Sequence, residues 1–254
     1  GGKEGLFEYV KYRAESEFKN DAPKLKTHEP SSKKENKSLP TIDRTPKLFI
    51  GGKQARPDGG NSITINDTFG NYVSEVPKSS RKDIRNAVEA AHACTSWSGM
   101  TGHAKAQVLY YIAENLSVRA EEFANRIVQM TNVNTTEAEK EVQASIERIY
   151  TYAAWADKYD GQVHHTTQRN VTLAMPERVG VIGIVCPDES PLLGFISTVI
   201  PAIAMGNSVV VIHSETSPLS ATDFYQILET SDVPAGCINI VTGSKDELTK
   251  EMAK

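Results

Sequence analysis

Residues 179–193 read VGVIGIVCPDESPLL, an apolar run that ends in two carboxylates between two prolines. Uninterrupted apolar runs of this kind are typical of strands that are covered on both faces of a sheet. We therefore expect residues 179–186 to form a fully buried strand. Asp188 and Glu189 then follow the carboxyl end of that strand, where open α/β sheets bind their ligands.

Two similar apolar runs follow in the sequence, and helical patterns separate the three. The further runs are residues 209–212 and 238–241, and the helical patterns are residues 192–205 and 219–231. Gly206 and Gly236 supply the residue type that commonly ends a helix. This alternation predicts an α/β fold, in which residues 176–254 form a βαβαβ mononucleotide-binding half with a parallel, Rossmann-like sheet.

The part of the chain before this sheet reads as short strands followed by helices. Extended patterns occur at residues 48–53, 62–65 and 72–76, and the first two lie on either side of a turn at residues 57–60. Four helical patterns follow: one after Ser80, one over residues 102–119, one from about residue 121, and one over residues 136–159. Ser80 is a good N-cap because Asp83 follows three residues later. Trp155 continues an apolar stripe at helical spacing, so we expect it in the core. Residues 79–160 are thus predicted to be a helical region.

Composition excludes several classes of partner. The chain has 254 residues, of which 39% are hydrophobic, a net charge of −4 and a pI near 5.9. This charge predicts no nucleic-acid binding, and no apolar run approaches the roughly 18 to 20 residues of a membrane span. Cys94, Cys186 and Cys237 are widely spaced, which favours a reducing, cytoplasmic setting. His164 and His165 lack metal-ligand spacing, so we expect a surface loop and no metal site.

Two segments precede the predicted domain. Residues 15–46 contain four prolines, repeated lysines and few apolar residues, which predicts a flexible linker. Its lysine cluster, Lys33, Lys34 and Lys37, could instead be a binding patch or a targeting signal. Residues 1–14 read as a strand or short ordered segment, and we expect them to be the end of an upstream unit. A tag remnant or a disordered terminus is the alternative.

Polar residues follow each of the three predicted strands of the sheet, at residues 186–191, 213–217 and 242–245. The carboxyl ends of parallel strands share one edge, where ligands bind. A carboxylate such as Glu215, placed after the second strand, can accept both hydroxyls of an adenosine ribose. The motif GxGxxG is absent, and Glu215 is equally well explained as a helix N-cap residue.

The chain from Leu48 onward resembles the N-terminal half of an aldehyde dehydrogenase. The resemblance rests on four stretches in matching order: KLFIGGK at residues 47–53, AAWADK at 153–158, PERVGV at 176–181 and PAIAMGN at 201–207. The opening GGKEGLFEYVKY resembles the carboxyl end of the same family. This order, the end of one aldehyde dehydrogenase unit, a linker and the start of another unit, resembles the tandem family 16 aldehyde dehydrogenases, whose second unit is incomplete. A single-unit dehydrogenase with an N-terminal extension is the alternative.

The resemblance implies oxidation of an aldehyde by a cysteine thiolate, with hydride transfer to NAD or NADP and a glutamate as general base. In the family both the thiol and the glutamate lie beyond the position of Lys254. Glu189 matches the family's oxyanion-donating asparagine, and Thr198 matches a lysine, so no catalytic residue is intact. An ionised carboxylate about 3 Å from an oxyanion repels it by roughly 5 kcal/mol at an effective dielectric constant of about 20.

The resemblance also predicts weak binding of the cofactor, or none. Ile212 replaces a lysine of the family, and Lys245 and Thr249 replace glycines that let a dinucleotide approach the backbone. The family's acidic residue is kept as Glu215. The residues expected to line what is left of a nucleotide cleft are Val185, Cys186, Pro187, Ser214, Glu215 and Gly243.

Two functions follow from this. The first is a catalytically degenerate pseudoenzyme or scaffold unit, whose partners are the upstream unit and a second copy or another protein, with residues 160–175 as an arm for oligomerisation. The second is part of an active NAD-dependent aldehyde dehydrogenase with an altered oxyanion site.

Overall fold

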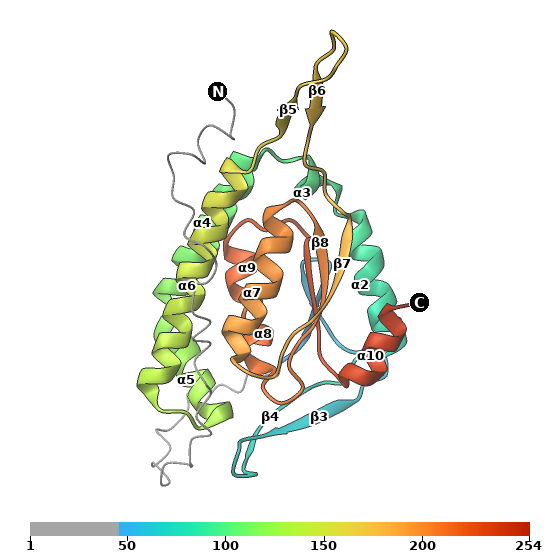
Figure 1. Ribbon diagram of the computed structural model, residues 1–254. Coiled ribbons are helices and arrows are strands. Elements are labelled where there is room, and N and C mark those ends of the chain that lie inside the picture. Colours follow the sequence, from blue (N-terminus) through green and yellow to red (C-terminus); the bar gives the residue numbers. More distant parts are fainter. Residues whose placement is uncertain (1–45) are drawn as a thin grey trace. The chain divides into compact units, whose positions relative to one another are not determined.

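The computed structural model describes residues 46–254 (Figure 1). The predicted end of an upstream unit, residues 1–14, and the predicted linker up to residue 45 lie outside the described residues. The strands are β1 (Leu48–Ile50), β2 (Lys53–Ala55), β3 (Ser62–Asn66), β4 (Tyr72–Pro77), β5 (Gln162–His164), β6 (Thr172–Ala174), β7 (Val181–Val185), β8 (Ser208–Ile212) and β9 (Ile238–Val241). The helices are α2 (Arg81–Ala93), α3 (Thr95–Gly99), α4 (Gly102–Val118), α5 (Ala120–Thr131), α6 (Thr135–Lys158), α7 (Pro191–Ala204), α8 (Leu219–Asp223), α9 (Tyr225–Thr230) and α10 (Lys245–Met252).

The predicted βαβαβ half is confirmed. Strands β7, β8 and β9 pair in parallel, with Val181 opposite Ser208 and Val209 opposite Ile238, and α7 connects β7 to β8. The five-stranded sheet has the order β2-β1-β9-β8-β7. Because β9, β8 and β7 are adjacent and run parallel, their carboxyl ends lie at the same edge of the sheet.

An antiparallel hairpin of β1 and β2 extends the sheet beside β9, which the sequence pattern did not predict. Gly51 and Gly52 form its turn with φ of 62° and 74°, a backbone conformation that side chains with a Cβ disfavour. The buried Asn239 of β9 accepts a hydrogen bond from Gly51 N at 2.9 Å and donates to Val209 O and Gly236 O. This single amide therefore joins the hairpin to the parallel strands.

Helices cover both faces of the sheet (Figure 1). The larger core lies on the side of α4 to α9 and includes Trp97, Phe195 and Phe224. A smaller core lies on the side of α2 and α10, where Ile84 and Leu248 contact β8 residues. Side chains of β8 alternate between these two cores, with Val209 and Val211 on one side and Val210 and Ile212 on the other. Within residues 46–254, none of the helices combines the length and the hydropathy that a membrane crossing needs.

The prediction that residues 179–186 form a fully buried strand is wrong. Gly183 is exposed and Val185 keeps 39% of its surface exposed, although Ile184 and Cys186 are buried. The reason is position: among the described strands β7 pairs only with β8, so it lies at an edge of the sheet. Its apolar composition is that of a central strand, but it has one neighbour.

Three smaller predictions also need correction. Trp155 is 55% exposed, because it points about 200° away from the buried Ala153 on the same helix. The helix expected over residues 219–231 is divided at Phe224, whose N–H bonds to Ala221 O three residues back. The extended stretch 48–53 is not one strand, because Gly51 and Gly52 turn the chain back on itself between β1 and β2. The stretch 62–65 pairs with β4.

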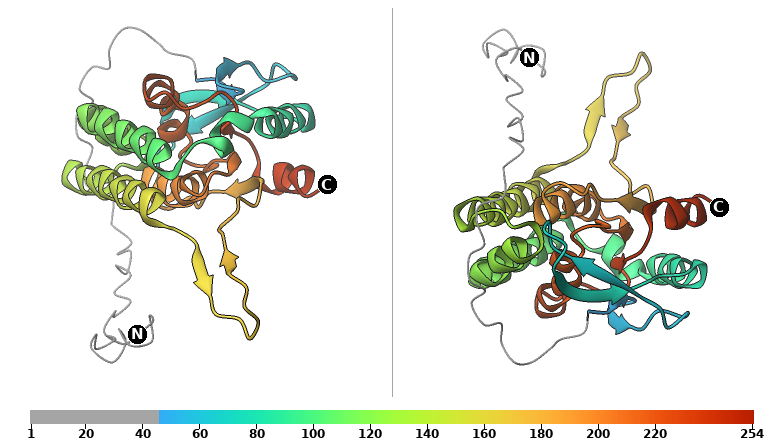
Figure 2. Two further views of the ribbon diagram at one scale, coloured as in Figure 1. Left: turned by 90° about the horizontal axis from the view of Figure 1, so that it is seen from above. Right: turned by 90° about the horizontal axis from the view of Figure 1, so that it is seen from below.

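The β5–β6 hairpin projects away from the helices and the sheet (Figure 2). All six residues of its two strands are exposed, including Val163 and Leu173. The segment predicted as an arm, residues 160–175, therefore extends from the rest of the described residues as a two-stranded ribbon. His164 lies in this ribbon and His165 directly after its first strand.

Candidate functional site

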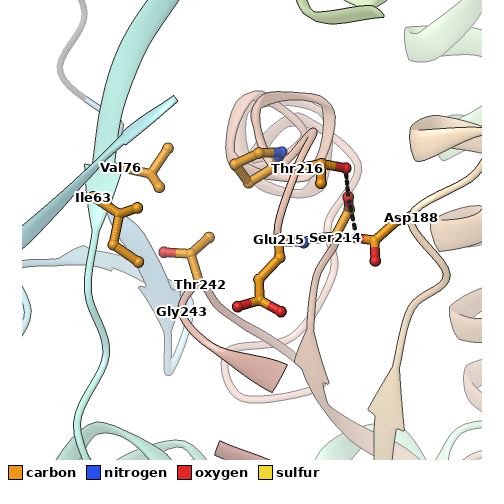
Figure 3. A pocket seen from close by; sticks show the side chains of 9 residues that line it. Ile63, Val76, Asp188, Ser214, Glu215, Thr216, Thr242 and Gly243 are labelled. Atoms are coloured by element: carbon orange, nitrogen blue, oxygen red, sulfur yellow. Dashed lines mark hydrogen bonds between the residues drawn. The ribbon is translucent and has the colours of Figure 1, made fainter. Parts of the chain in front are cut away.

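A pocket of about 330 Å³ lies at the carboxyl ends of β8 and β9 (Figure 3). It is lined by Ile63, Val76, Asp188, Ser214, Glu215, Thr216, Pro218, Thr242 and Gly243. Ile63 and Val76 come from the β3–β4 hairpin and form an apolar wall opposite the strand ends. Its volume is at the lower end of the range for small-molecule sites, roughly 300 to 1,000 Å³.

Gly243 gives the pocket part of its floor, in a conformation that suits glycine. Its φ is 151°, and a Cβ at this position would lie 2.9 Å from the Leu248 side chain. The adjacent Thr242 holds the β3–β4 hairpin, because its hydroxyl donates to Pro77 O and its carbonyl accepts from Ser79 N. The turn after β9 is therefore packed tightly on both sides.

Asp188 connects the ends of the parallel strands. Its Oδ1 accepts hydrogen bonds from Ser214 Oγ at 2.8 Å and from Glu215 N at 2.9 Å, both of which follow β8. Its Oδ2 lies 2.7 Å from Lys245 Nζ, which follows β9. Partial burial disfavours the charged carboxylate, but the hydrogen bonds from Lys245, Ser214 and Glu215 outweigh it and lower the pKa of Asp188.

Ser214 and Glu215 point in different directions from the same loop. The Ser214 hydroxyl also accepts from Ser217 N at 3.0 Å, so this loop is closed on itself. In Figure 3 the Glu215 carboxylate points towards Thr242 and Gly243, away from Asp188. The pocket thus contains one carboxylate that is paired with a lysine, Asp188, and one that is exposed, Glu215.

The loop after β7 carries an exposed carboxylate, Glu189, where the resemblance places the oxyanion donor. Glu189 is exposed, and Ser190 follows with a φ of 50° as the N-cap of α7. The Glu141 side chain from α6 accepts hydrogen bonds from Leu192 N at 2.8 Å and Leu193 N at 3.0 Å. Burial raises the pKa of Glu141, and the two N–H groups offset part of this effect.

Thr198 does not point a donor out of α7. Its hydroxyl donates to Gly194 O at 2.9 Å, on the preceding turn of the same helix, and lies 3.6 Å from the Cys186 sulfur. Burial raises the pKa of Cys186 to about 11 and raises that of Cys237 well above its ordinary value. Neither thiol is therefore a thiolate at neutral pH, and neither has the character of a nucleophile.

The residues at the end of β8 are apolar or neutral. Ile212 is buried in the core shared with α2 and does not line the pocket. His213 is buried against the Phe195 ring, with Nε2 3.1 Å from Pro191 O and Nδ1 without a partner among the described residues. Burial lowers the pKa of His213 to about 4, so the imidazole is neutral at pH 7.

Half of the predicted cleft residues meet in the pocket. Ser214, Glu215 and Gly243 line it. Val185, Cys186 and Pro187 precede Asp188 in the chain and do not line the pocket. Ile63, Val76 and Pro218 line the pocket but lie outside the three stretches that the sequence predicted at this edge; Ile63 and Val76 come from a distant hairpin and carry no local signal. Within residues 46–254, His, Cys, Asp and Glu side chains do not gather in threes in a way that could hold a metal ion.

Comparison with known proteins identifies the family. The family model described as "Aldehyde dehydrogenase family" matches residues 56–254. The chain belongs to the aldehyde dehydrogenase family. An aldehyde dehydrogenase of Agaricus bisporus is 34% identical over 204 residues, which are 77% of this chain and 40% of that protein. The cytosolic 10-formyltetrahydrofolate dehydrogenase of Mus musculus is 30% identical over 213 residues, 80% of this chain and 24% of that protein.

Solved structures agree with the aldehyde dehydrogenase fold. An NAD-dependent aldehyde dehydrogenase from Sinorhizobium meliloti matches with a TM-score of 0.80 and 25% identity, over 84% of this chain and 44% of that one. The NAD⁺ complex of an aldehyde dehydrogenase from Bacillus cereus matches with a TM-score of 0.80 and 25% identity, over 82% and 44%. The chain therefore spans less than half of the length of these relatives.

Proposed function

We propose that this chain is a catalytically degenerate unit of an aldehyde dehydrogenase family protein, which keeps the fold for packing, assembly or partner binding. The observation that carries the proposal is the ion pair of Lys245 with Asp188 across the carboxyl edge of the sheet. A dinucleotide fold needs glycine where its backbone meets the pyrophosphate. Here Lys245 occupies that turn, and its ammonium group pairs with the Asp188 carboxylate.

The residues present do not fit a bound NAD or NADP well. The aldehyde dehydrogenase from Bacillus cereus binds NAD⁺, so the family resemblance assigns this unit a nicotinamide cofactor. Against it stand the buried Ile212, which supplies no charge to the pocket, and the Asp188 carboxylate, which would repel a phosphate group. We therefore propose that cofactor binding by this unit is weak or lost.

The oxyanion position supports the same proposal. Glu189 is an exposed carboxylate in the loop where the resemblance places a side-chain donor. A good donor stabilises an oxyanion by roughly 3 to 4 kcal/mol, and a carboxylate does the opposite. Thr198 bonds to its own helix, so it does not replace the missing donor.

A second candidate is an active dehydrogenase with an altered oxyanion site. It is favoured by the retained Glu215 and by the open pocket beside it. The two candidates differ in what Glu189 does. In an active site the carboxylate opposes the reaction, so replacing it with an amide should accelerate turnover; in a degenerate unit the replacement should change nothing.

The test is aldehyde-dependent reduction of NAD⁺ and NADP⁺ by the whole protein and its Glu189→Gln variant. Equal rates, or no activity in either, are expected from the proposal. A rate increase of about tenfold or more in Glu189→Gln would contradict it and favour the altered active site. Glu139→Gln, which changes another exposed glutamate, on α6, is the matched control for a general loss of negative charge.

We further propose that the chain joins two units of a tandem protein that resembles family 16 aldehyde dehydrogenases. The order of the sequence supports this: a family-like carboxyl end at residues 1–14, a linker, and a family match from residue 56. The projecting β5–β6 hairpin, with exposed Val163 and Leu173, supports self-association or binding of the upstream unit.

A further inference from the structure

The Asp188 carboxylate is contacted by three donors at the edge of the sheet where the parallel strands end. Asp188 accepts the Ser214 hydroxyl, the Glu215 backbone N–H and the Lys245 ammonium group, at distances of 2.8, 2.9 and 2.7 Å. A hydroxyl, a backbone N–H and a cation are the donors with which proteins bind phosphate groups. They converge here on a side chain of the same protein.

The three donors around Asp188 are held in place by their surroundings. Lys245 keeps only 18% of its side chain exposed although it is a lysine at a surface edge. The Ser214 hydroxyl is fixed from the other side by Ser217 N, so its proton is directed at Asp188. Figure 3 shows Asp188 on one side of Ser214 and the Glu215 carboxylate on the other, so Glu215 does not compete for these donors.

We propose that Asp188 is an internal substitute for an anionic ligand, and that Lys245, Ser214 and the Glu215 N–H form a phosphate-binding site that this carboxylate occupies. The proposal rests on the proposed function, since it explains why a unit with this fold fails to bind a phosphate-bearing cofactor. The ligand class is a phosphate or pyrophosphate group. The carboxylate makes the site self-satisfied, and its removal leaves a cation and two donors without an acceptor.

The experiment measures binding of inorganic phosphate and of pyrophosphate to the full chain by isothermal titration calorimetry. Asp188→Ala is expected to bind both at least about tenfold more tightly than the unchanged protein, because a charge-assisted set of donors is released. Asp188→Asn keeps the size of the side chain and the acceptor for Glu215 N, and frees only Lys245. It should give a smaller gain of the same sign and guards against loss of folding in the alanine variant.

Two controls separate this site from a general change in charge. Glu189→Ala removes one negative charge from the neighbouring residue, which no donor of the described residues engages, and should bind phosphate as the unchanged protein does. Lys245→Met in the Asp188→Ala background should remove the gain. Equal affinity of Asp188→Ala and the unchanged protein, or an equal gain in Glu189→Ala, overturns the proposal. Binding of NAD⁺ by the unchanged protein would instead overturn the proposed function, so the two failures are distinguishable.

Discussion

His213 is the buried ionisable residue whose surroundings have the clearest consequence for stability. The pKa of its imidazole is lowered to about 4 by burial, whereas an unfolded histidine titrates near 6.5. The unfolded chain therefore binds a proton between these values that the folded chain does not. Stability is complete above pH 6.5 and falls as the pH decreases from 6.5 towards 4. The groups facing His213 are the Pro191 carbonyl, Asp188 and Lys245.

We expect His213 to account for a loss of about 2 kcal/mol in the free energy of unfolding between pH 7 and pH 5. Urea unfolding of the full chain at both values measures it. In His213→Leu this part of the pH dependence should disappear, even if the variant is less stable at pH 7. His164→Leu removes an exposed histidine from β5 and should leave the difference unchanged. An unaltered pH dependence in His213→Leu would show that the imidazole is not held neutral.

At the scale of elements, α7 depends on a carboxylate from another helix. Glu141 of α6 accepts the N–H groups of Leu192 and Leu193, which have no partner of their own in the first turn of α7. This contact fixes the start of α7 and therefore the loop that carries Asp188 and Glu189. It connects helix packing to the geometry of the pocket.

Glu141→Ala is expected to lower the free energy of unfolding by about 1.5 to 3 kcal/mol, since it leaves two N–H groups unpaired beneath α6. Glu139→Ala, an exposed position on the same helix, should change it by less than about 0.5 kcal/mol. Urea midpoints of the two variants give the comparison. Similar midpoints for both would mean that α7 is held by its apolar contacts alone.

The elements differ in how well local sequence predicts them. The βαβαβ order and the capping pair Ser80 and Asp83 follow from short-range pattern, and both occur in the structure. The edge position of β7 and the β1–β2 hairpin depend on which strands become neighbours, so the apolar run at residues 179–186 could not show them. Trp155 was misplaced because a stripe at helical spacing has two edges, and only packing decides which one faces the core.

The residues of the pocket were also only partly predictable from local sequence. Glu215 could be predicted because a polar residue after a parallel strand has a known place in the fold. That Lys245 would pair with Asp188 could not, since the ion pair joins the ends of two strands that are not neighbours in the sheet. The sequence indicated that Lys245 replaces a glycine of the family, but not that its ammonium group would meet Asp188.

At the scale of the whole molecule, the five-stranded sheet of residues 46–254 ends in two edge strands, the short β2 and the parallel strand β7. Among the described strands β7 has no second neighbour, and its outer edge carries exposed Gly183 and Val185. Open strand edges and projecting hairpins are places where a further strand or another chain pairs. This fits our proposal that the unit keeps its fold for packing and assembly, while the residues at the strand ends no longer suit a dinucleotide.

The most direct test of this account is a titration of the full chain with NADH and NADPH, followed by the fluorescence of the reduced nicotinamide. We expect no saturable change up to about 1 mM, which corresponds to a binding free energy weaker than about 4 kcal/mol. A saturable change with a dissociation constant in the micromolar range would contradict it, because it would mean that the cofactor cleft works despite the Asp188–Lys245 pair.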